Sequence, residues 1–167
     1  MHRLEQVPME KHTKAKNGPT DAEKREKWRE YYDAALVEPL RWVQHDVTAS
    51  ADPDLCRLRD AHGMEALGRW WVLVELIASA RGHSVDVSTT PAWARLAGKL
   101  EFYGPDAVEE CRAFVGALYD LDLINRESFE EFGRIRSRRI DRNAEFAAKD
   151  VANGKLGLFV RYYGREQ

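Results

Sequence analysis

The sequence has only two cysteines among its 167 residues, and it lacks an uninterrupted apolar run of the roughly 18 residues that a membrane-spanning helix needs. Its first residues also lack the apolar segment of a secretory signal. Small secreted folds normally carry more cysteines than this, so Cys56 and Cys111 are expected to be reduced, apolar residues of the core. These absences favour a cytoplasmic protein without a membrane segment.

The common motifs of phosphate-binding loops, dinucleotide-binding folds, serine hydrolases and zinc proteases are also missing. The His45-Asp46 doublet is typical of metal-dependent phosphohydrolases, but a metal shell needs further ligands, and the other histidines do not stand at ligand spacing. We therefore expect the doublet to hydrogen-bond the backbone ahead of a helix that opens at Pro53. The sequence predicts no enzyme, no metal site and no cofactor.

The chain has no surplus of either charge, since 26 basic and 28 acidic side chains give a formal net charge of −2. The distribution along the chain is uneven. Residues 31–131 carry nine basic and 18 acidic side chains, whereas residues 132–167 carry nine basic and four acidic ones. An acidic body with a basic end indicates that any contact with a polyanion is local.

Apolar periodicity and capping residues predict a mainly helical chain after a polar arm of about 20 residues. Pro53 and Pro91 follow capping residues and open helices, with Thr90 as the expected cap of the second, and Gly63 and Gly82 close helices. The predicted helices cover residues 20–37, 53–62, 65–81, 90–100, 105–119 and 138–151, the last ending before Asn153-Gly154. The predicted strands cover residues 84–88, 121–124 and 134–136, and the tail at 156–163 is either a strand or a docking segment.

This order of elements is that of a winged-helix domain. The helices at 90–100 and 105–119 would form a helix-turn-helix, and the strands at 121–124 and 134–136 would form the wing. The strand at 84–88 would pair at its edge. The predicted core consists of Trp70, Trp71, Val74, Ile77, Leu96, Phe114, Val115, Leu118 and Leu123.

We therefore expect a mainly α fold with a small β-wing, that is, a winged helix-turn-helix with extra N- and C-terminal helices. Residues 1–38 would be a polar arm and an N-terminal amphipathic helix. Residues 39–137 would be the winged-helix domain, and residues 138–167 would be a basic C-terminal helix with an aromatic tail.

Several short motifs resemble, in their order, the N-terminal winged-helix domain of phage replisome-organiser proteins, relatives of DnaD-type primosome proteins. The first motifs are Trp42-Val43-Gln44-His45-Asp46, Asp52-Pro53, Leu58-Arg59, His62-Gly63, Leu67-Gly68 and Val74-Glu75-Leu76. The later ones are the segment 118–124, the acidic segment 127–133 and Arg134-Ile135-Arg136-Ser137. Gln44 stands where the family usually has proline. The resemblance implies a role in replication initiation and brings no catalytic residues.

Arginines cluster around the end of the predicted wing. Arg134 and Arg136 would project from one side of a strand, and Arg138 and Arg142 would lie one turn apart on the following helix. Guanidinium groups suit phosphate oxygens. The predicted DNA-binding residues are Lys99, Arg112, Arg134, Arg136, Arg138, Arg139 and Arg142. The alternative is a solvated face balanced by Asp141, Glu145 and the acidic segment.

The helix at 105–119, which would be the recognition helix, begins with Asp106, Glu109 and Glu110. These carboxylates repel phosphates where base contacts usually arise. The first hypothesis is therefore a winged-helix DNA-binding module of a phage or mobile-element replication initiator, with wing-led and weakly specific contact.

The second hypothesis is a protein-interaction or oligomerisation module. Its predicted partner-binding residues are Trp28, Tyr31, Tyr32, Tyr162 and Tyr163. The one-sided aromatic face of the helix at 20–37 either packs on its own domain or docks on another subunit. Expected partners are DNA, a second copy of the chain, or replication proteins such as a helicase loader.

Overall fold

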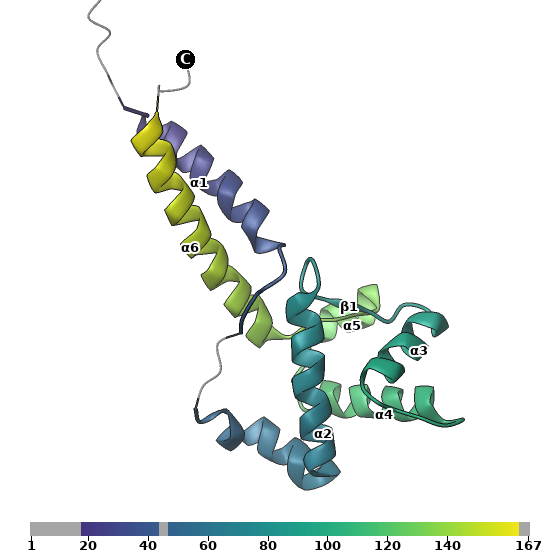
Figure 1. The fold of residues 1–167 in the computed structure, drawn as a ribbon. Helices are drawn as coiled ribbons and strands as arrows, with labels where there is room; N and C mark the ends of the chain where they lie inside the picture. Colours follow the sequence, from purple (N-terminus) through teal and green to yellow (C-terminus); the bar gives the residue numbers. More distant parts are fainter. Residues whose placement is uncertain (1–17, 44–46, 164–167) are drawn as a thin grey trace, which may run out of the picture.

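The computed structural model describes residues 18–43 and 47–163 (Figure 1). The described chain is mainly helical with one small two-stranded antiparallel sheet. Its elements are α1 (Asp21–Leu36), the 3-10 turn η1 (Ala49–Ala51), α2 (Pro53–Ser79), β1 (Val85–Asp86), α3 (Thr90–Lys99), α4 (Ala107–Asp120), α5 (Arg126–Phe132), β2 (Arg134–Ile135) and α6 (Arg138–Tyr162). The His45-Asp46 doublet and most of the predicted polar arm lie outside the described residues.

Local capping explains where α1 and α2 begin. The Thr20 hydroxyl accepts a hydrogen bond from the Glu23 backbone N–H at 3.2 Å, while the Glu23 carboxylate accepts one from the Thr20 backbone N–H at 2.6 Å. This reciprocal capping box confirms the predicted start of the first helix. Hydrogen bonds from the Thr20 backbone N–H, the Thr20 hydroxyl and the Tyr163 hydroxyl hold the pKa of the Glu23 carboxyl below its ordinary value. Asp52 caps α2 in a similar way, with Pro53 in the first turn.

The predicted break at Gly63 is present as a kink within α2. Gly63 has φ 81° and ψ 175°, a conformation outside the helical region, although the helix resumes immediately and continues to Ser79. The two predicted helices are therefore two arms of one kinked element. The part of α2 after Gly63 provides the centre of the core, where Leu73 and Ile77 are completely buried.

The pair α3 and α4 confirms the two predicted helices between residues 90 and 120. They pack against each other, and the turn between them runs through Phe102 and Gly104. The expected cap of α3 is wrong by one residue, because the Thr89 hydroxyl rather than that of Thr90 accepts the hydrogen bond from the Ala92 N–H.

The predicted wing hairpin is wrong. Residues 121–124 form a turn, not a strand, and residues 126–132, predicted as a loop, form α5. The Asn125 side chain caps this helix by accepting the Ser128 N–H at 2.8 Å, and Gly133 ends it in a left-handed conformation. A backbone hydrogen bond from the Asn125 N–H to the Arg136 carbonyl links the segments expected to pair.

The strand predicted at 134–136 exists as β2. Its expected hairpin partner at 121–124 is absent, and it pairs with β1, the strand predicted at 84–88 and expected at the edge of the wing. The two strands are antiparallel, with Val85 opposite Ile135 and Asp86 opposite Arg134. The returning segment thus closes the core against the strand that precedes α3. Ile135 is completely buried as a result.

The predicted end of the last helix at residue 151 is also wrong, because α6 continues through Asn153-Gly154 to Tyr162. The tail is therefore helical through Tyr162, and the strand alternative is wrong. The Asn153 side chain accepts a hydrogen bond from the Trp28 indole N–H at 2.8 Å. This contact with α1 holds Asn153 on the flank of a continuous helix, where the sequence pattern indicates a helix end.

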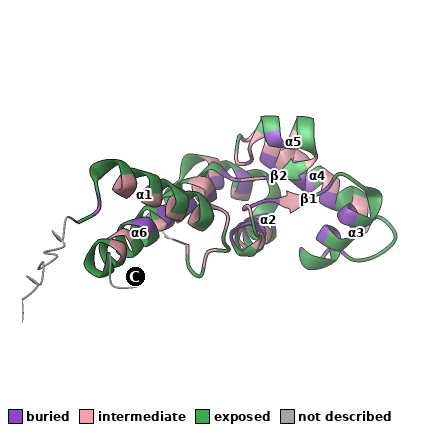
Figure 2. Ribbon diagram, turned by 90° about the horizontal axis from the view of Figure 1, so that it is seen from above, coloured by how far each residue is buried: buried purple, intermediate pink, exposed green. Residues whose placement is uncertain are grey.

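The chain forms a compact body of α2 to α5 and a projecting arm in which α1 and α6 lie side by side (Figures 1 and 2). On α6, Ala144, Ala148 and Ala152 are buried at intervals of four residues, and their small side chains allow the α1 backbone to approach. The base of the arm is tied to the body, since the Gly82 N–H donates to the Val37 carbonyl and the Leu40 N–H donates to the Ala78 carbonyl.

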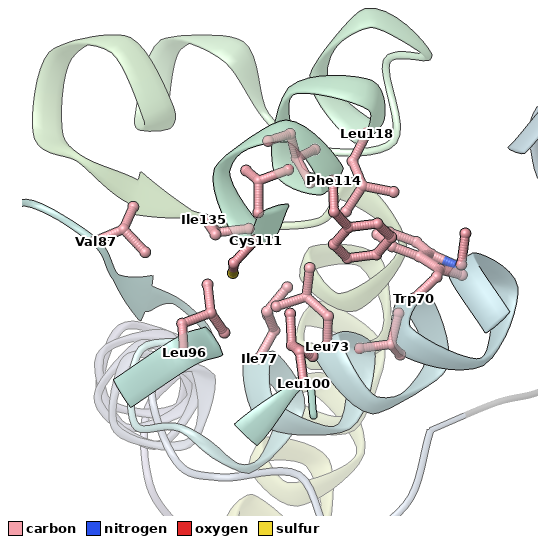
Figure 3. Packing of buried hydrophobic residues seen from close by; sticks show 14 of the residues in the cluster. Trp70, Leu73, Ile77, Val87, Leu96, Leu100, Cys111, Phe114, Leu118 and Ile135 are labelled. Carbon is pink, nitrogen blue, oxygen red and sulfur yellow. The ribbon is translucent and has the colours of Figure 1, made fainter. Parts of the chain in front are cut away.

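Most of the predicted core is confirmed (Figure 3). Trp70, Val74, Ile77, Leu96, Phe114, Val115 and Leu118 are buried, as are many residues that no prediction named. Trp71 and Leu123 are the corrections, because both are only partly buried and pack against the edge of the cluster.

A substitution at Gly133 tests the connection between α5 and β2. Gly133→Ala should lower the free energy of unfolding by about 2 kcal/mol, because φ is +57° and an added Cβ would lie 2.9 Å from the Ser88 Cα. The measurement is urea unfolding followed by circular dichroism.

The matched control is Gly157→Ala in α6, where a Cβ would meet open space. This change should raise the free energy of unfolding by about 0.5–1 kcal/mol. Equal effects of the two alanines would contradict the described connection between α5 and β2.

Candidate nucleic-acid interface

The structure does not present the predicted arginines as an open ridge on a wing. Arg136 forms an ion pair with Asp141 at 2.7 Å, and Arg138 forms one with Asp122 at 3.1 Å. Arg134 donates from Nε to the Ser84 hydroxyl at 2.9 Å. These three side chains therefore make contacts within the chain that sequence spacing does not reveal.

The surface of α3 and α4 carries charges of both signs, with Arg95 exposed on α3. Arg112 lies over the Trp93 ring, 4.5 Å from its centroid, with Glu109 3.7 Å away. Lys99 is exposed at the end of α3. The first turn of α4 exposes Glu109 and Glu110, so two carboxylates face solvent at the start of this helix.

Three of the predicted arginines, Arg138, Arg139 and Arg142, line one cleft of about 890 Å³ between the start of α6 and the start of α2. We call it the arginine cleft. Its α6 side is formed by Ser137, Arg138, Arg139, Arg142, Asn143 and Phe146. The rest of the lining includes Asp52, Asp54, Leu55, Trp70, Asp122 and Leu123.

The carboxylates of the cleft already have partners. Asp52 accepts hydrogen bonds from the backbone N–H groups of Asp54 and Leu55, and Asp54 pairs with Arg57. Asp122 lies between two guanidinium groups, Arg126 at 3.4 Å and Arg138 at 3.1 Å. These pairings reduce the repulsion that the three acids would exert on an incoming anion.

Arg142 is the least engaged cation of the cleft, because no ion pair or hydrogen bond joins its side chain to another residue in the described ranges. Arg139 lies over Trp71, with its guanidinium 5.4 Å from the ring centroid. Both side chains come from the first turns of a 25-residue helix, and the positive end of the helix dipole adds to their field.

The predicted partner-binding aromatics lie on the arm, and most make contacts within the chain. Trp28 stacks on Tyr32 with a centroid distance of 5.0 Å, and Lys155 lies 5.6 Å from the Tyr31 ring. The Tyr163 hydroxyl donates to the Glu23 carboxylate at 2.9 Å, and Tyr162 is half exposed. Of the two alternatives for α1, packing on its own chain is confirmed.

Sequence reasoning missed an apolar stripe on α6, because the helix was expected to end at residue 151. Val151, Gly154 and Leu158 are exposed on this stripe, and Ala147 is half-buried. The spacing of four, three and four residues places them on one face. Beside the stripe, a groove of about 480 Å³ runs to the segment after α1, where Trp42 is exposed.

The described residues contain no group of histidines, cysteines and carboxylates that could hold a metal ion. In the same ranges, no helix combines the length and the apolarity needed to span a bilayer. Comparison of the chain with protein-family models, with curated proteins and with solved structures gave no match.

The two thiols provide a chemical test of the packing. Burial raises the pKa of the Cys111 thiol to about 11, and its side chain is completely covered, whereas Cys56 is partly exposed. Iodoacetamide at pH 8 should therefore label Cys56 and leave Cys111 unmodified, because the thiolate is the reactive form. Both should react in denaturant. Stoichiometric labelling of Cys111 in the folded protein, read by mass spectrometry, would contradict the packing of α4.

Proposed function

We propose that this chain is a non-enzymatic, winged-helix-type DNA-binding module of a phage or mobile-element replication initiator. It contacts DNA through the arginine cleft with weak sequence specificity. The observation that carries the proposal is the convergence of Arg138, Arg139 and Arg142 with the first turn of α6 around one cleft. Arginine forks and helix N-termini both favour phosphate oxygens.

The order of elements supports a winged-helix-type arrangement. A helix leads into β1, the helical pair α3 and α4 follows, and β2 returns to pair with β1. The helix α5 occupies the position in the chain where a wing loop would lie. The motifs that resemble replisome-organiser domains span the same region, so fold and resemblance favour the same class of protein.

The charge distribution favours phosphate contact over base reading. The acidic first turn of α4 opposes insertion of this helix into a groove lined by phosphates. Contacts from α6 to phosphates give affinity and a dependence on salt, and they carry no sequence information. Weak specificity follows from this division between the two helices.

A salt series tests the proposal. Fluorescence anisotropy with labelled DNA should show affinity that falls as salt rises, because counterions are released from the phosphates. Arg142→Ala should weaken binding several-fold and reduce the slope of log K against log salt by about 0.9 if one phosphate contact is lost.

The matched control is Arg161→Ala, which removes an exposed arginine from the far end of the same helix. It should leave both the affinity and the slope unchanged. Absence of binding at low salt would overturn the proposal. Equal effects of Arg142→Ala and Arg161→Ala would show that DNA does not bind at the arginine cleft.

The second candidate function is self-association through the arm. The specific observation is the α6 stripe of Ala147, Val151, Gly154 and Leu158, where two large apolar side chains face solvent. Contiguous exposed apolar surface is typical of protein contacts. α1 has no fully buried residue. A second copy that packs on the arm would bury apolar surface that the single chain leaves exposed.

Light scattering over a range of concentrations tests this candidate. Self-association predicts a mass above that of the monomer that falls on dilution, and Leu158→Glu should raise the dimer dissociation constant at least tenfold. Val160→Glu places the same charge on another face of α6 at a similarly exposed position, and it should have little effect. A monomer at every concentration would exclude the candidate.

A further inference from the structure

An exposed aromatic ring lies in the arginine cleft. Phe146 lines the cleft from α6, and 55% of its surface is exposed to solvent. It follows Arg142 by four residues, so the ring and the guanidinium lie on one face of the helix, one turn apart. An aromatic face beside a cation is the pairing that proteins use to stack an unpaired base next to its phosphate.

The other end of the cleft contains an unused hydrogen-bonding group. Ser137 stands at the N-cap of α6 with only 1% of its surface exposed, and it lines the cleft. Its hydroxyl does not cap the helix and has no hydrogen-bond partner among the described residues. A phosphate oxygen at the helix start would accept a hydrogen bond from this hydroxyl.

The carboxylates oppose a second strand. Asp52, Asp54 and Asp122 line the same cleft as the arginines. A duplex would bring the phosphates of both strands toward this surface, and its bases would stay stacked inside the helix, away from Phe146. A single strand places one phosphate row along α6 and leaves its bases available.

From these contacts we infer that the arginine cleft takes unpaired DNA. One phosphate lies at Ser137 and Arg142, and a neighbouring base stacks on Phe146. The inference rests on the proposed function and deepens it. It specifies that the DNA is single-stranded and that the Phe146 ring distinguishes it from a duplex. Phe146 was not among the residues expected from the sequence.

The experiment compares a fluorescein-labelled oligothymidylate with a labelled duplex of the same length at one salt concentration. The single strand should bind at least tenfold more tightly than the duplex. Phe146→Ala should weaken single-strand binding about tenfold, the effect expected for one stacked base, and it should leave duplex binding unchanged. Ser137→Ala should weaken single-strand binding several-fold.

The matched control is Phe132→Ala, which removes an even more exposed ring (63%) from α5, outside the cleft. It should not change the affinity for either DNA. The salt series separates the two contacts of the cleft. Phe146→Ala should keep the wild-type salt slope because no charge is lost, whereas Arg142→Ala should lower it.

The outcomes distinguish this inference from the function on which it rests. Equal affinity for single strand and duplex, with no effect of Phe146→Ala, would overturn the inference and leave DNA binding in place. Binding to neither DNA would overturn both. Melting curves followed by circular dichroism establish that each variant is folded at the temperature of the assay.

Discussion

The burial of two isoleucines on either side of Ser137 fixes the start of α6, and the arginine cleft depends on that position. Ile135 ends the short sheet, Ile140 begins the helix, and both are completely buried. The chain can turn only within the few residues between them. Arg138, Arg139 and Arg142 therefore project from a helix start held by the core. Each isoleucine contributes about 1.5–3 kcal/mol through burial.

The helices with standard capping residues could be predicted from the sequence. Thr20, Asp52 and the Pro-opened first turn of α3 marked helix starts, and the apolar second arm of α2 marked the core. Helix α5, which lies where the loop of a wing was expected, could not be predicted in this way. Asn125 and Gly133 are the cap and the terminator of a short helix, but the acidic residues between them have the composition of a loop. Tertiary contacts make that helix part of the body, such as the packing of Phe129 against Trp93 and Tyr119.

The arginines of the candidate site could be predicted from the sequence, but their partners and their arrangement around a cleft could not. Local spacing indicated the arginines of α6, but it could not show that Asp141 pairs with Arg136 or that Asp122 pairs with Arg138. Those partners depend on the tertiary fold. Asp122 is especially hard to foresee, since it has a positive φ of 57° in a segment that alternates like a strand. Phe146 was not among the predicted site residues, because only charge marked the arginines of the same helix.

The unbroken course of α6 has a mechanical consequence. Its 25 residues span roughly 38 Å at the usual rise of an α-helix, and the same rod forms one wall of the cleft and one half of the arm. A tilt of a few degrees in its first turn would move the far end by several ångströms, as a lever does. A change in the tilt of α6 at the arginine cleft would therefore also change the position of the arm.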